Sequence, residues 1–541
     1  MTKTWWRDAA IYQIYPRSFQ DTNGDGEGDL AGVIERLPFL AGLGVDALWL
    51  SPFYKSPNRD GGYDVSDPRD VDPRFGSLVD AKELILKTHE HGMKIIFDIV
   101  PNHFSSDHIW FQEALKSKPG SPSRNRFHFY DGRGPEGNEP PNNWNSVFGG
   151  PSWSRVKEAD GSLGQWYLHL FDSSQPDLNW ENPEVAEDFE KTLRFWLDLG
   201  IDGFRIDVAH GLAKDAISQN HPDPEGLTRA LRLDVVDMEK TVRENLLKDI
   251  PFFDRDGVHQ IYRQWRKILD SYEGDRMSVA EILVFPTIRG TRYVRPDELH
   301  QIFNFDFLVA PWDATMIKES IDRTLREVAT VGAPATWVLC NHDSSRIVSR
   351  LGDSDKAKAL SMILHALPGG IYIYQGEELG LPDADVPSEF RQDPVFFRSN
   401  GSDNGRDGCR VPLPWLSAAE NYGFSTGSPW LPQPKAWADY AVDVESADPN
   451  SFLNFYKKSL ALRKSHPALG GEDSIQWIES PESVLHFQRS LGLQIIANLG
   501  AETYSLNFTS EVEILHSSRV EIVVQDGVLN VPSNTTVWLQ F

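Results

Sequence analysis

Three carboxylates with basic neighbours are the candidates for chemistry in this sequence. Arg205 and Asp207 lie two residues apart in the run IDGFRIDVAH, so in an extended strand their side chains point to the same side. Glu281 ends the apolar run MSVAE, and Asp343 follows His342 in the run ATWVLCNHD. A guanidinium beside a carboxyl group favours its ionised form, which suits Asp207 to nucleophilic attack. Burial raises the pKa of a carboxyl group, which suits Glu281 to proton donation.

Each of these features also has a purely structural interpretation. An Arg-x-Asp pair is most often a structural ion pair, and a lone Glu is often satisfied by a neighbouring Arg or by the backbone. Asp343 is equally well placed to cap a helix over SSRIVSRL. Together, however, the three favour glycoside cleavage through a covalent intermediate, in which one carboxylate attacks and another donates a proton. The third carboxylate is then free to hold substrate hydroxyl groups.

Eight short apolar runs occur along the chain, three of which contain these residues, and helical patterns separate most of the runs. The runs end in polar residues, as buried parallel strands do. Helical patterns such as those at 81–92 and 185–200 end at glycine. Eight strand–helix units predict an α/β fold, a (β/α)8 TIM barrel with its active site at the carboxyl ends of the strands. A doubly wound open sheet is the alternative. The predicted strands are 10–19, 45–54, 94–103, 201–210, 277–284, 301–308, 335–343 and 369–380.

Two segments depart from the strand–helix alternation. Residues 104–177, after the third strand, are rich in Pro, Gly, Asn and Trp, and a connection of this length is usually functional. We predict an inserted subdomain there. Residues 465–541 contain short alternating strands separated by turn residues, which predicts a C-terminal antiparallel β domain. The barrel then comprises residues 1–103 and 178–464, with a mostly helical connection at 211–270.

The composition restricts the classes of partner. The 541 residues carry a formal net charge of -26, which argues against a nucleic-acid partner and favours a neutral or cationic ligand. There is no apolar run of 18 residues and no apolar leader in MTKTWWRDAA, so we expect no membrane association and a cytoplasmic location. The two cysteines, Cys340 and Cys409, lack metal-ligand spacing. Either a monomer or a homodimer fits these observations.

The motifs resemble those of the α-amylase family, glycoside hydrolase family 13. The likeness extends over essentially the whole chain, and four signature regions occur in the family's order. QPDLNW (175–180) resembles a fifth region in the form found in oligo-1,6-glucosidase and α-glucosidase relatives. AIYQIYPRSF (10–19), GGYDVSDP (61–68) and QGEELG (375–380) fit the same branch. The four signature regions are DIVPNH (98–103), GFRIDVAH (203–210), VAE (279–281) and NHD (341–343).

The resemblance implies a role for each candidate residue. Asp207 would be the nucleophile and Glu281 the general acid/base, while Asp343 would bind the 2- and 3-hydroxyl groups of the sugar. Arg205 would orient Asp207, and Asp98 would brace the site.

Other residues are implied to surround the same glucose unit. Tyr63 would stack on the sugar ring, and Asp64 would bind the hydroxyl groups farthest from the scissile bond. His103 and His342 would bind further hydroxyl groups, and Phe171 would form a pocket wall.

The loop GRDGCRVPLPW (405–415) resembles an RDxxRTPMxW motif of the α-glucosidase branch. In that branch an Arg of this loop pairs with the Asp of GGYD, closes the pocket beyond the terminal sugar and makes the enzyme exo-acting. Arg406 is the favoured partner, and Arg410 is the alternative. The chain departs from the motif at Val411 and Leu413, where Thr and Met are usual.

The resemblance therefore implies a retaining, exo-acting α-glucosidase that releases α-glucose from short α-glucosides, with transglucosylation left open. Val208 follows the nucleophile, as in relatives that cleave α-1,6 bonds, whereas DVAHGLAKD resembles enzymes with α-1,4 preference. We expect α-1,4 activity, with an oligo-1,6-glucosidase as the first alternative. Trehalose synthase, sucrose isomerase and amylosucrase are further alternatives. A non-enzymatic homologue, like the heavy chains of amino-acid transporters, would have lost the catalytic carboxylates that this chain keeps.

The stretch DTNGDGEGDL (21–30) packs four carboxylates and an Asn into one turn. Its spacing matches the first part of an EF-hand loop, but Gly32 stands where an EF-hand has a bidentate Glu. The branch that the chain resembles carries a structural Ca²⁺ or Mg²⁺ in this loop, with the backbone carbonyl of Glu27 as one ligand. No redox or organic cofactor is implied. The implied metal ligands are Asp21, Asn23, Asp25, Glu27 and Asp29.

Overall fold

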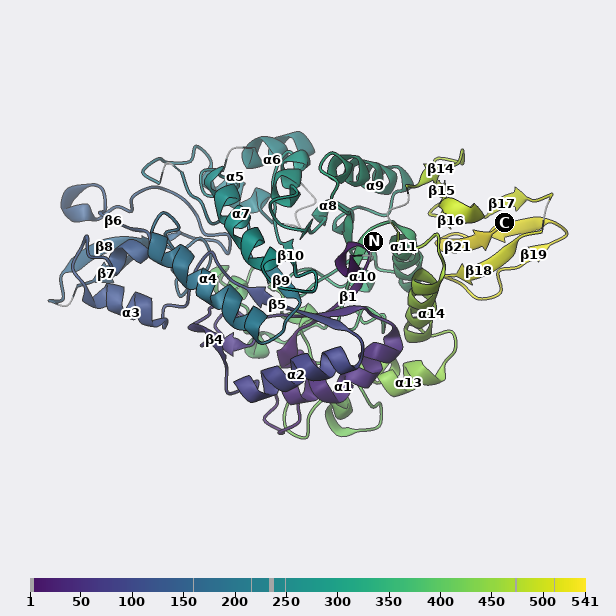
Figure 1. The fold of residues 1–541 in the computed structure, drawn as a ribbon, viewed down its shortest axis with the longest axis horizontal. Coiled ribbons are helices and arrows are strands. Elements are labelled where there is room, and N and C mark those ends of the chain that lie inside the picture. The colour runs from purple at the N-terminus through teal and green to yellow at the C-terminus, as the bar shows by residue number, and fades with distance from the viewer. Residues whose placement is uncertain are drawn as a thin grey trace.

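The structure is a computed structural model that describes residues 4–158, 160–215, 217–232, 238–248, 250–471, 474–509 and 511–541. Three parts lie along its longest axis (Figure 1). The barrel occupies the middle, a small sheet inserted after β5 lies at one end, and the C-terminal sheets lie at the other.

Eight parallel strands form the central sheet, in the order β11-β10-β9-β5-β2-β1-β13-β12. The first and last strands of this order are joined by a hydrogen bond from Thr336 Oγ1 to the carbonyl of Ile302. The (β/α)8 barrel is thereby confirmed. Its strands are β1 (Ala10–Ile14), β2 (Ala47–Leu50), β5 (Lys94–Ile99), β9 (Gly203–Ile206), β10 (Met277–Ala280), β11 (Gln301–Ile302), β12 (Thr336–Val338) and β13 (Gly370–Tyr374).

Helices surround the barrel, and the helical patterns at 81–92 and 185–200 correspond to α2 and α4. Asp29 caps the first helix by accepting a hydrogen bond from Gly32 N at 2.7 Å, and Gly44 ends it in the left-handed conformation with φ 96°. Asn182 caps the long helix before β9. The helices are α1 (Leu30–Leu43), α2 (Leu78–Glu90), α4 (Pro183–Asp198), α5 (Pro224–Ala230), α6 (Lys240–Leu247), α7 (Gly257–Asp270), α9 (Ala314–Ala329), α10 (Ile347–Leu351), α11 (Ser354–Ala366), α12 (Pro394–Arg398), α13 (Val442–Ala447) and α14 (Phe452–Ser465).

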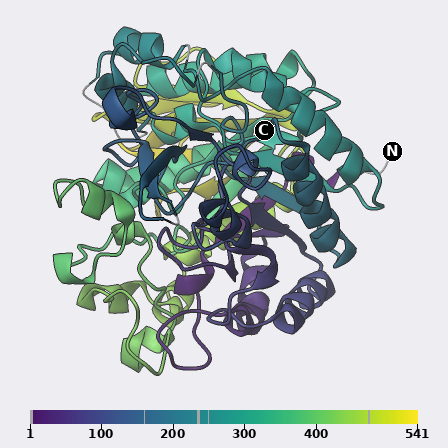
Figure 2. The same ribbon diagram turned by 90° about the vertical axis from the view of Figure 1, so that its left-hand side faces the viewer.

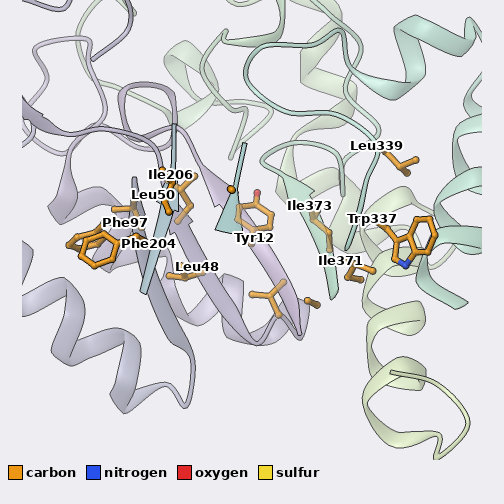
Figure 3. Close-up of a cluster of buried hydrophobic side chains, with 14 of the residues drawn as sticks. Tyr12, Leu48, Leu50, Phe97, Phe204, Ile206, Trp337, Leu339, Ile371 and Ile373 are labelled. Carbon is orange, nitrogen blue, oxygen red and sulfur yellow. The ribbon is translucent and has the colours of Figure 1, made fainter. Parts of the chain in front are cut away.

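Alternation along the strands decides which side chains face the interior of the barrel. A buried cluster packs the outer faces of the strands against the helices, and Figure 3 shows Leu48, Phe97, Phe204 and Ile206 in it. Ile96 and Val279 belong to a separate cluster inside the barrel, together with Trp49. Because side chains alternate, Arg205 points inward between two outward-facing neighbours. Asp98 and Glu281 share the parity of Ile96 and Val279, so they point inward too.

The segment between β5 and α4 forms a small unit of its own, which faces the viewer in Figure 2. It contains α3 (Ile109–Lys116) and a three-stranded antiparallel sheet in the order β6-β8-β7. Its strands are β6 (Phe129–Tyr130), β7 (Trp153–Lys157) and β8 (Leu163–Leu168). A two-stranded ribbon, β3 (Tyr54–Lys55) with β4 (Asp67–Val71), follows β2.

Two antiparallel sheets form the C-terminal part, as predicted. Their orders are β14-β15-β16-β21-β18 and β17-β20-β19. Thr536 Oγ1 donates to the carbonyl of Ala359 on α11, and Trp538 Nε1 donates to that of Met362. The strands are β14 (Gln476–Trp477), β15 (Val484–Gln488), β16 (Leu493–Asn498), β17 (Tyr504–Asn507), β18 (Glu513–Ser517), β19 (Val524–Gln525), β20 (Val528–Val531) and β21 (Thr535–Gln540).

One predicted strand is wrong over half of its length. Within 301–308 only Gln301–Ile302 is a strand, and Phe305–Leu308 forms the short helix α8. The physical reason is Asn304, whose side chain accepts a hydrogen bond from Phe307 N at 3.2 Å and starts the helix. None of the helices in the described part of the chain is long and apolar enough to cross a lipid bilayer.

Candidate active site

One guanidinium group lies at the centre of the carboxylate cluster. Arg205 Nη1 lies 2.7 Å from Asp207 Oδ1 and 2.9 Å from Asp98 Oδ1, while Arg205 Nη2 lies 2.7 Å from Glu281 Oε2. The three acids come from β5, β9 and β10, which are neighbours in the sheet, and each lies at the carboxyl end of its strand. A single positive charge is therefore shared by three carboxyl groups.

Asp98 lies deepest in the cluster and is fully buried. Its Oδ2 accepts hydrogen bonds from Trp49 Nε1 at 3.1 Å and from Tyr63 Oη at 3.0 Å. Burial raises the pKa of Asp98 to about 6, although the Arg205 guanidinium opposes the rise. These contacts and Arg205 use both carboxylate oxygens of Asp98, so its side chain is held in place among buried groups.

Asp207 differs from the sequence-based expectation in its ionisation. Its side chain is 8% exposed, and burial raises its pKa well above the usual value, with Glu281, Asp98 and Asp343 adding to the rise. The Arg205 guanidinium opposes this shift without outweighing it. The expected low pKa of Asp207 is therefore wrong, because one cation cannot balance burial and several acids. Asp207 must be ionised to attack as a nucleophile, and Arg205 is the group that favours its ionised form.

The residue after Asp207 adopts a strained backbone conformation. Val208 has φ 42°, a left-handed value that β-branched residues rarely adopt. Its N–H donates to Glu281 Oε2 at 3.2 Å, and its carbonyl accepts from Gly211 N at 2.9 Å. The strained turn thus connects the end of β9 to Glu281, which follows β10. Strained backbone conformations are often found at active sites. Glu281 is less buried than expected, since its side chain is 21% exposed.

Asp343 follows β12, two strands from β10 around the barrel, and lies among basic groups. Its Oδ1 is 2.9 Å from Arg406 Nη1 and 2.7 Å from Arg410 Nη2, and its Oδ2 is 3.2 Å from His342 Nε2. Burial alone would raise the pKa of Asp343, but His342 and the two guanidinium groups outweigh burial and hold it well below the usual range. Helix α10 begins at Ile347, so Asp343 is not its cap.

Arg406 connects Asp343 to the far wall of the site. Its Nη2 lies 2.7 Å from Asp60 Oδ1, and its Nε lies 2.7 Å from Asp393 Oδ2. Arg410 also contacts Asp343, but its Nε donates to the carbonyl of His342 at 2.8 Å instead. Of the two arginines that the motif left open, Arg406 is therefore the one that spans to the loop after β3.

The role expected for Asp64 is wrong. Asp64 is fully buried, and its oxygens accept hydrogen bonds from Ser56 Oγ at 2.9 Å, Arg59 N at 3.1 Å and Asp60 N at 3.2 Å. These donors hold it inside the turn, away from the sugar pocket. Asp60 takes its place as the partner of Arg406 and also accepts from Gln175 Nε2 at 2.9 Å. Sequence reasoning missed Asp60, although it too flanks the Gly-Gly pair.

Aromatic rings line the space between these groups. The rings of Tyr63 and His342 stack at 5.2 Å between centroids with 9° between their planes. The ring centroid of Phe171 lies 5.4 Å from that of His103 and 5.4 Å from that of Phe148. His103 is buried, and burial lowers its pKa to about 4, so it is neutral near pH 7 and keeps both hydrogen-bonding roles.

Phe148 was not predicted from the sequence. The Arg406 guanidinium lies 5.0 Å from the centre of its ring, which places it in the same wall. Its run, WNSVFGG, carries no charge or spacing signal that marks it as part of a site.

Comparison with known proteins identifies the family. A family model for the α-amylase catalytic domain matches residues 13–471. The chain belongs to the α-amylase family. An oligo-1,6-glucosidase of Parageobacillus thermoglucosidasius is 36% identical, with 93% of this chain and 92% of that protein covered. A probable α-glucosidase of Rhizobium meliloti (strain 1021) is 39% identical, over 91% and 88% of the two chains.

Among solved structures of this family, the α-glucosyl transfer enzyme XgtA is similar to the chain over almost its whole length. The TM-score is 0.89, the sequences are 37% identical, and 99% of each chain is covered. Membership of the α-amylase family through the α-glucosidase branch, as the motifs predicted, is thereby confirmed.

The acidic loop of this family member offers oxygen donors that suit a hard cation. Asn23 and Asp25 are exposed, and each accepts one backbone N–H within the loop, at 2.8 and 2.9 Å. The Glu27 side chain points elsewhere, since its Oε1 lies 2.6 Å from Arg17 Nη2. Within the described ranges, no group of three or more His, Cys, Asp or Glu side chains is arranged to hold a metal ion. A cation here would therefore need Asn23 and the Glu27 carbonyl as well as carboxylates.

Proposed function

We propose that the protein is a retaining, exo-acting α-glucosidase that releases α-glucose from the non-reducing end of short α-glucosides. The observation that carries the proposal is the arrangement around Arg205. Asp207 and Glu281 contact different nitrogens of one guanidinium, and Asp343, which is partly exposed, is near enough to influence the charge of Asp207. A nucleophile, a proton donor and a third acid that binds hydroxyl groups are the parts that retaining hydrolysis of a glucoside requires.

The reaction follows from the positions of these groups. Asp207 attacks the anomeric carbon and forms an ester, while Glu281 gives its proton to the departing glycosidic oxygen. Glu281 then accepts a proton from water, and the hydroxide attacks the same carbon and frees Asp207. Asp343, held ionised by Arg406 and Arg410, accepts hydrogen bonds from the sugar hydroxyl groups.

The exo action is supported by the wall beyond Asp343. Arg406 bridges Asp343 to Asp60, and Phe148 lies against the same guanidinium. A wall of this kind leaves room for one terminal sugar and blocks a chain that would continue past it. Short substrates with a free non-reducing end are therefore preferred.

The linkage preference is a finer part of the proposal. Val208 occupies the strained turn beside Asp207, and its side chain packs in a cluster with Leu170 and Phe253. We propose α-1,4 activity, with α-1,6 activity as the second candidate because an oligo-1,6-glucosidase is among the relatives. Transglucosylation belongs to the same proposal, since an acceptor alcohol can replace water in the second step. An α-glucosyl transfer enzyme is among the similar structures.

Product analysis on maltose, isomaltose, sucrose and trehalose tests the function. Proton NMR recorded in the first minutes, before mutarotation, should show α-glucose released from at least one of these sugars. The release of β-glucose would contradict retention, and the release of no glucose from any of them would contradict the proposal as a whole.

We also propose that the loop 21–29 holds a structural Ca²⁺ or Mg²⁺. The support is its oxygen-rich donor set and its place against the segment after α12, where Ser425 donates to Asp21 and Trp430 N donates to the carbonyl of Gly26 at 3.0 Å. A cation there would neutralise crowded carboxylates and stabilise the loop after β1. It would take no part in the reaction. A cytoplasmic location fits the two buried, unlinked cysteines.

A further inference from the structure

One buried lysine beside the active site has no part in the reaction described above. The side chain of Lys214 is fully buried, and so is that of its partner Asp177, with Nζ and Oδ2 3.0 Å apart. Lys214 Nζ also donates to Asn102 Oδ1 at 3.1 Å and to the carbonyl of Gly211 at 2.7 Å. The ammonium group therefore uses all three of its donors on three different segments of the chain.

Each partner of Lys214 contacts either a residue of the sugar pocket or the chain neighbour of one. Asn102 Nδ2 contacts His103 Nδ1 at 3.2 Å and Asp177 Oδ2 at 3.2 Å. Asp177 Oδ1 accepts a hydrogen bond from Leu170 N at 2.9 Å, directly before Phe171.

The third partner leads to the nucleophile. Gly211 N donates at 2.9 Å to the carbonyl of Val208, the strained residue that follows Asp207. A Cβ on Gly211 would lie 2.9 Å from a methyl group of Val208, so this approach is tight. One lysine thus holds the end of β5, the inserted segment and the turn after β9 in register.

We propose that Lys214 is a positioning residue for the glucose unit. It fixes His103, Phe171 and the turn after Asp207 relative to one another, and so it controls how tightly the sugar is held and how well it is aligned for attack. This inference rests on the proposed α-glucosidase function and adds a residue to it. Misplacement of aligned groups by about 1 Å lowers turnover by about 100-fold.

A second lysine–aspartate pair offers a matched control. Lys94 Nζ lies 2.9 Å from Asp202 Oδ1, at the amino-terminal end of β5 and β9, away from the carboxylate cluster. Both pairs involve a buried aspartate and adjoin the same strands. The pair of Lys214 lies beyond the carboxyl ends of these strands, where the pocket residues are, whereas the pair of Lys94 lies at their opposite ends.

The test compares Lys214→Met, the double variant Lys214→Met/Asp177→Asn, and Lys94→Met. The double variant removes both buried charges together, so it avoids the unpaired buried carboxylate that the single variant leaves at Asp177. We would measure the melting temperature, kcat and KM on a glucoside that the wild type cleaves, and the dissociation constant of D-glucose by calorimetry.

The expected result is a folded double variant whose kcat/KM falls by about 100-fold, with glucose bound at least about tenfold more weakly. Lys94→Met should lower the melting temperature and leave kcat/KM within about twofold. A folded double variant with wild-type kcat/KM and glucose affinity would overturn the role of Lys214. Failure of the proposed function gives a different result, because the wild-type protein would then cleave none of the glucosides. The glucose affinities of the variants would still test the role of Lys214.

Discussion

Two buried aspartates lie at opposite ends of the same strand, β9, and their surroundings are reversed. Asp202, just before the strand, is fully buried and accepts from Lys94, Arg276 and His89 at 2.7 to 3.0 Å. Asp207, just after it, shares the single cation Arg205 with two other acids.

The two surroundings shift the carboxyl groups in opposite directions. Burial would raise the pKa of Asp202, but His89, Lys94 and the backbone N–H of Ile95 outweigh burial and lower it. Burial and neighbouring acids raise the pKa of Asp207. Hydrogen-bond donors and cations around Asp202 favour its ionised form, whereas burial and neighbouring acids disfavour the ionised form of Asp207. The same residue type on the same strand thus serves stability at one end and chemistry at the other.

The largest effect is expected from removing the reactive aspartate. Asp207→Asn should lower kcat by about 10⁴-fold or more, because the nucleophile is lost. Its melting temperature should stay at or above that of the wild type, since a buried anion among acids is removed. Activity assays and thermal unfolding on the same sample check both statements, and appreciable activity would refute the assignment.

Asp202→Asn should give the opposite pattern. Lys94, Arg276, His89 and the Ile95 N–H lose their anionic acceptor, which should cost about 2–4 kcal/mol of unfolding free energy. Urea denaturation measures this loss. The value of kcat at 25 °C should remain within about twofold of the wild type, and a large fall in kcat with unchanged stability would remove the contrast between the two ends.

The charge balance also predicts the effect of opening the far wall. Arg406→Met removes the cation that joins Asp343, Asp60 and Asp393, so kcat/KM on a disaccharide should fall by about 10- to 100-fold. Arg69→Met, which removes an ion pair with Asp188 outside the site, is the control. Equal kinetics in the two variants would show that Arg406 forms no part of the sugar pocket.

The two aspartates should also differ in how they affect stability as pH changes. The lowered pKa of Asp202 gives a stabilisation that is present above its unfolded value of about 3.9 and is lost as pH falls through its folded pKa. The raised pKa of Asp207 has the opposite sign, because the folded state binds the proton first.

This contrast is measured against the two Asn variants from pH 8 downward. The wild type should gain stability relative to Asp207→Asn on acidification toward pH about 3.9, and it should lose stability relative to Asp202→Asn below that pH. The account would be contradicted if the difference in unfolding free energy between the wild type and each variant changed with pH in the same direction for both variants.

The smallest effect is expected at the acidic loop. If a cation occupies 21–29, EDTA should lower the melting temperature by a few degrees, which corresponds to about 1 kcal/mol. Turnover at 25 °C should change little, because the loop contains none of the reacting groups. Asp25→Asn, at an exposed position of the loop, should reduce the response to EDTA. An unchanged melting temperature would count against a bound ion.

The sequence predicts the barrel because apolar runs and helical patterns alternate along it, and side-chain parity then places Asp98, Arg205 and Glu281 inside. It could not distinguish Asp60 from Asp64. Both flank the glycines at 61 and 62, and the side-chain directions depend on the positive φ angles there, 56° and 98°. Nor could it give the pKa of Asp207, which depends on how many acids the fold brings to one guanidinium.

The helix at 305–308 and the wall residue Phe148 were missed for a related reason. A short apolar run is compatible with either a strand or a helix until a side-chain cap such as that of Asn304 decides. An uncharged aromatic residue in a long connection gives no signal of its own. Spacing along the chain predicts which side of a strand a residue faces and the order of the strands. Contacts between loops that are distant in the sequence can be seen only in the folded structure.

The central claim is that Asp207 forms a covalent bond with the sugar during catalysis. The direct measurement is mass spectrometry of peptides after incubation with 5-fluoro-α-D-glucosyl fluoride, which slows release of a glucosyl–enzyme ester. The account predicts a fluoroglucosyl adduct on Asp207 and none on the peptides that contain Glu281 or Asp343. An adduct on either of those residues, or turnover of the reagent to β-anomeric product with no adduct, would contradict it.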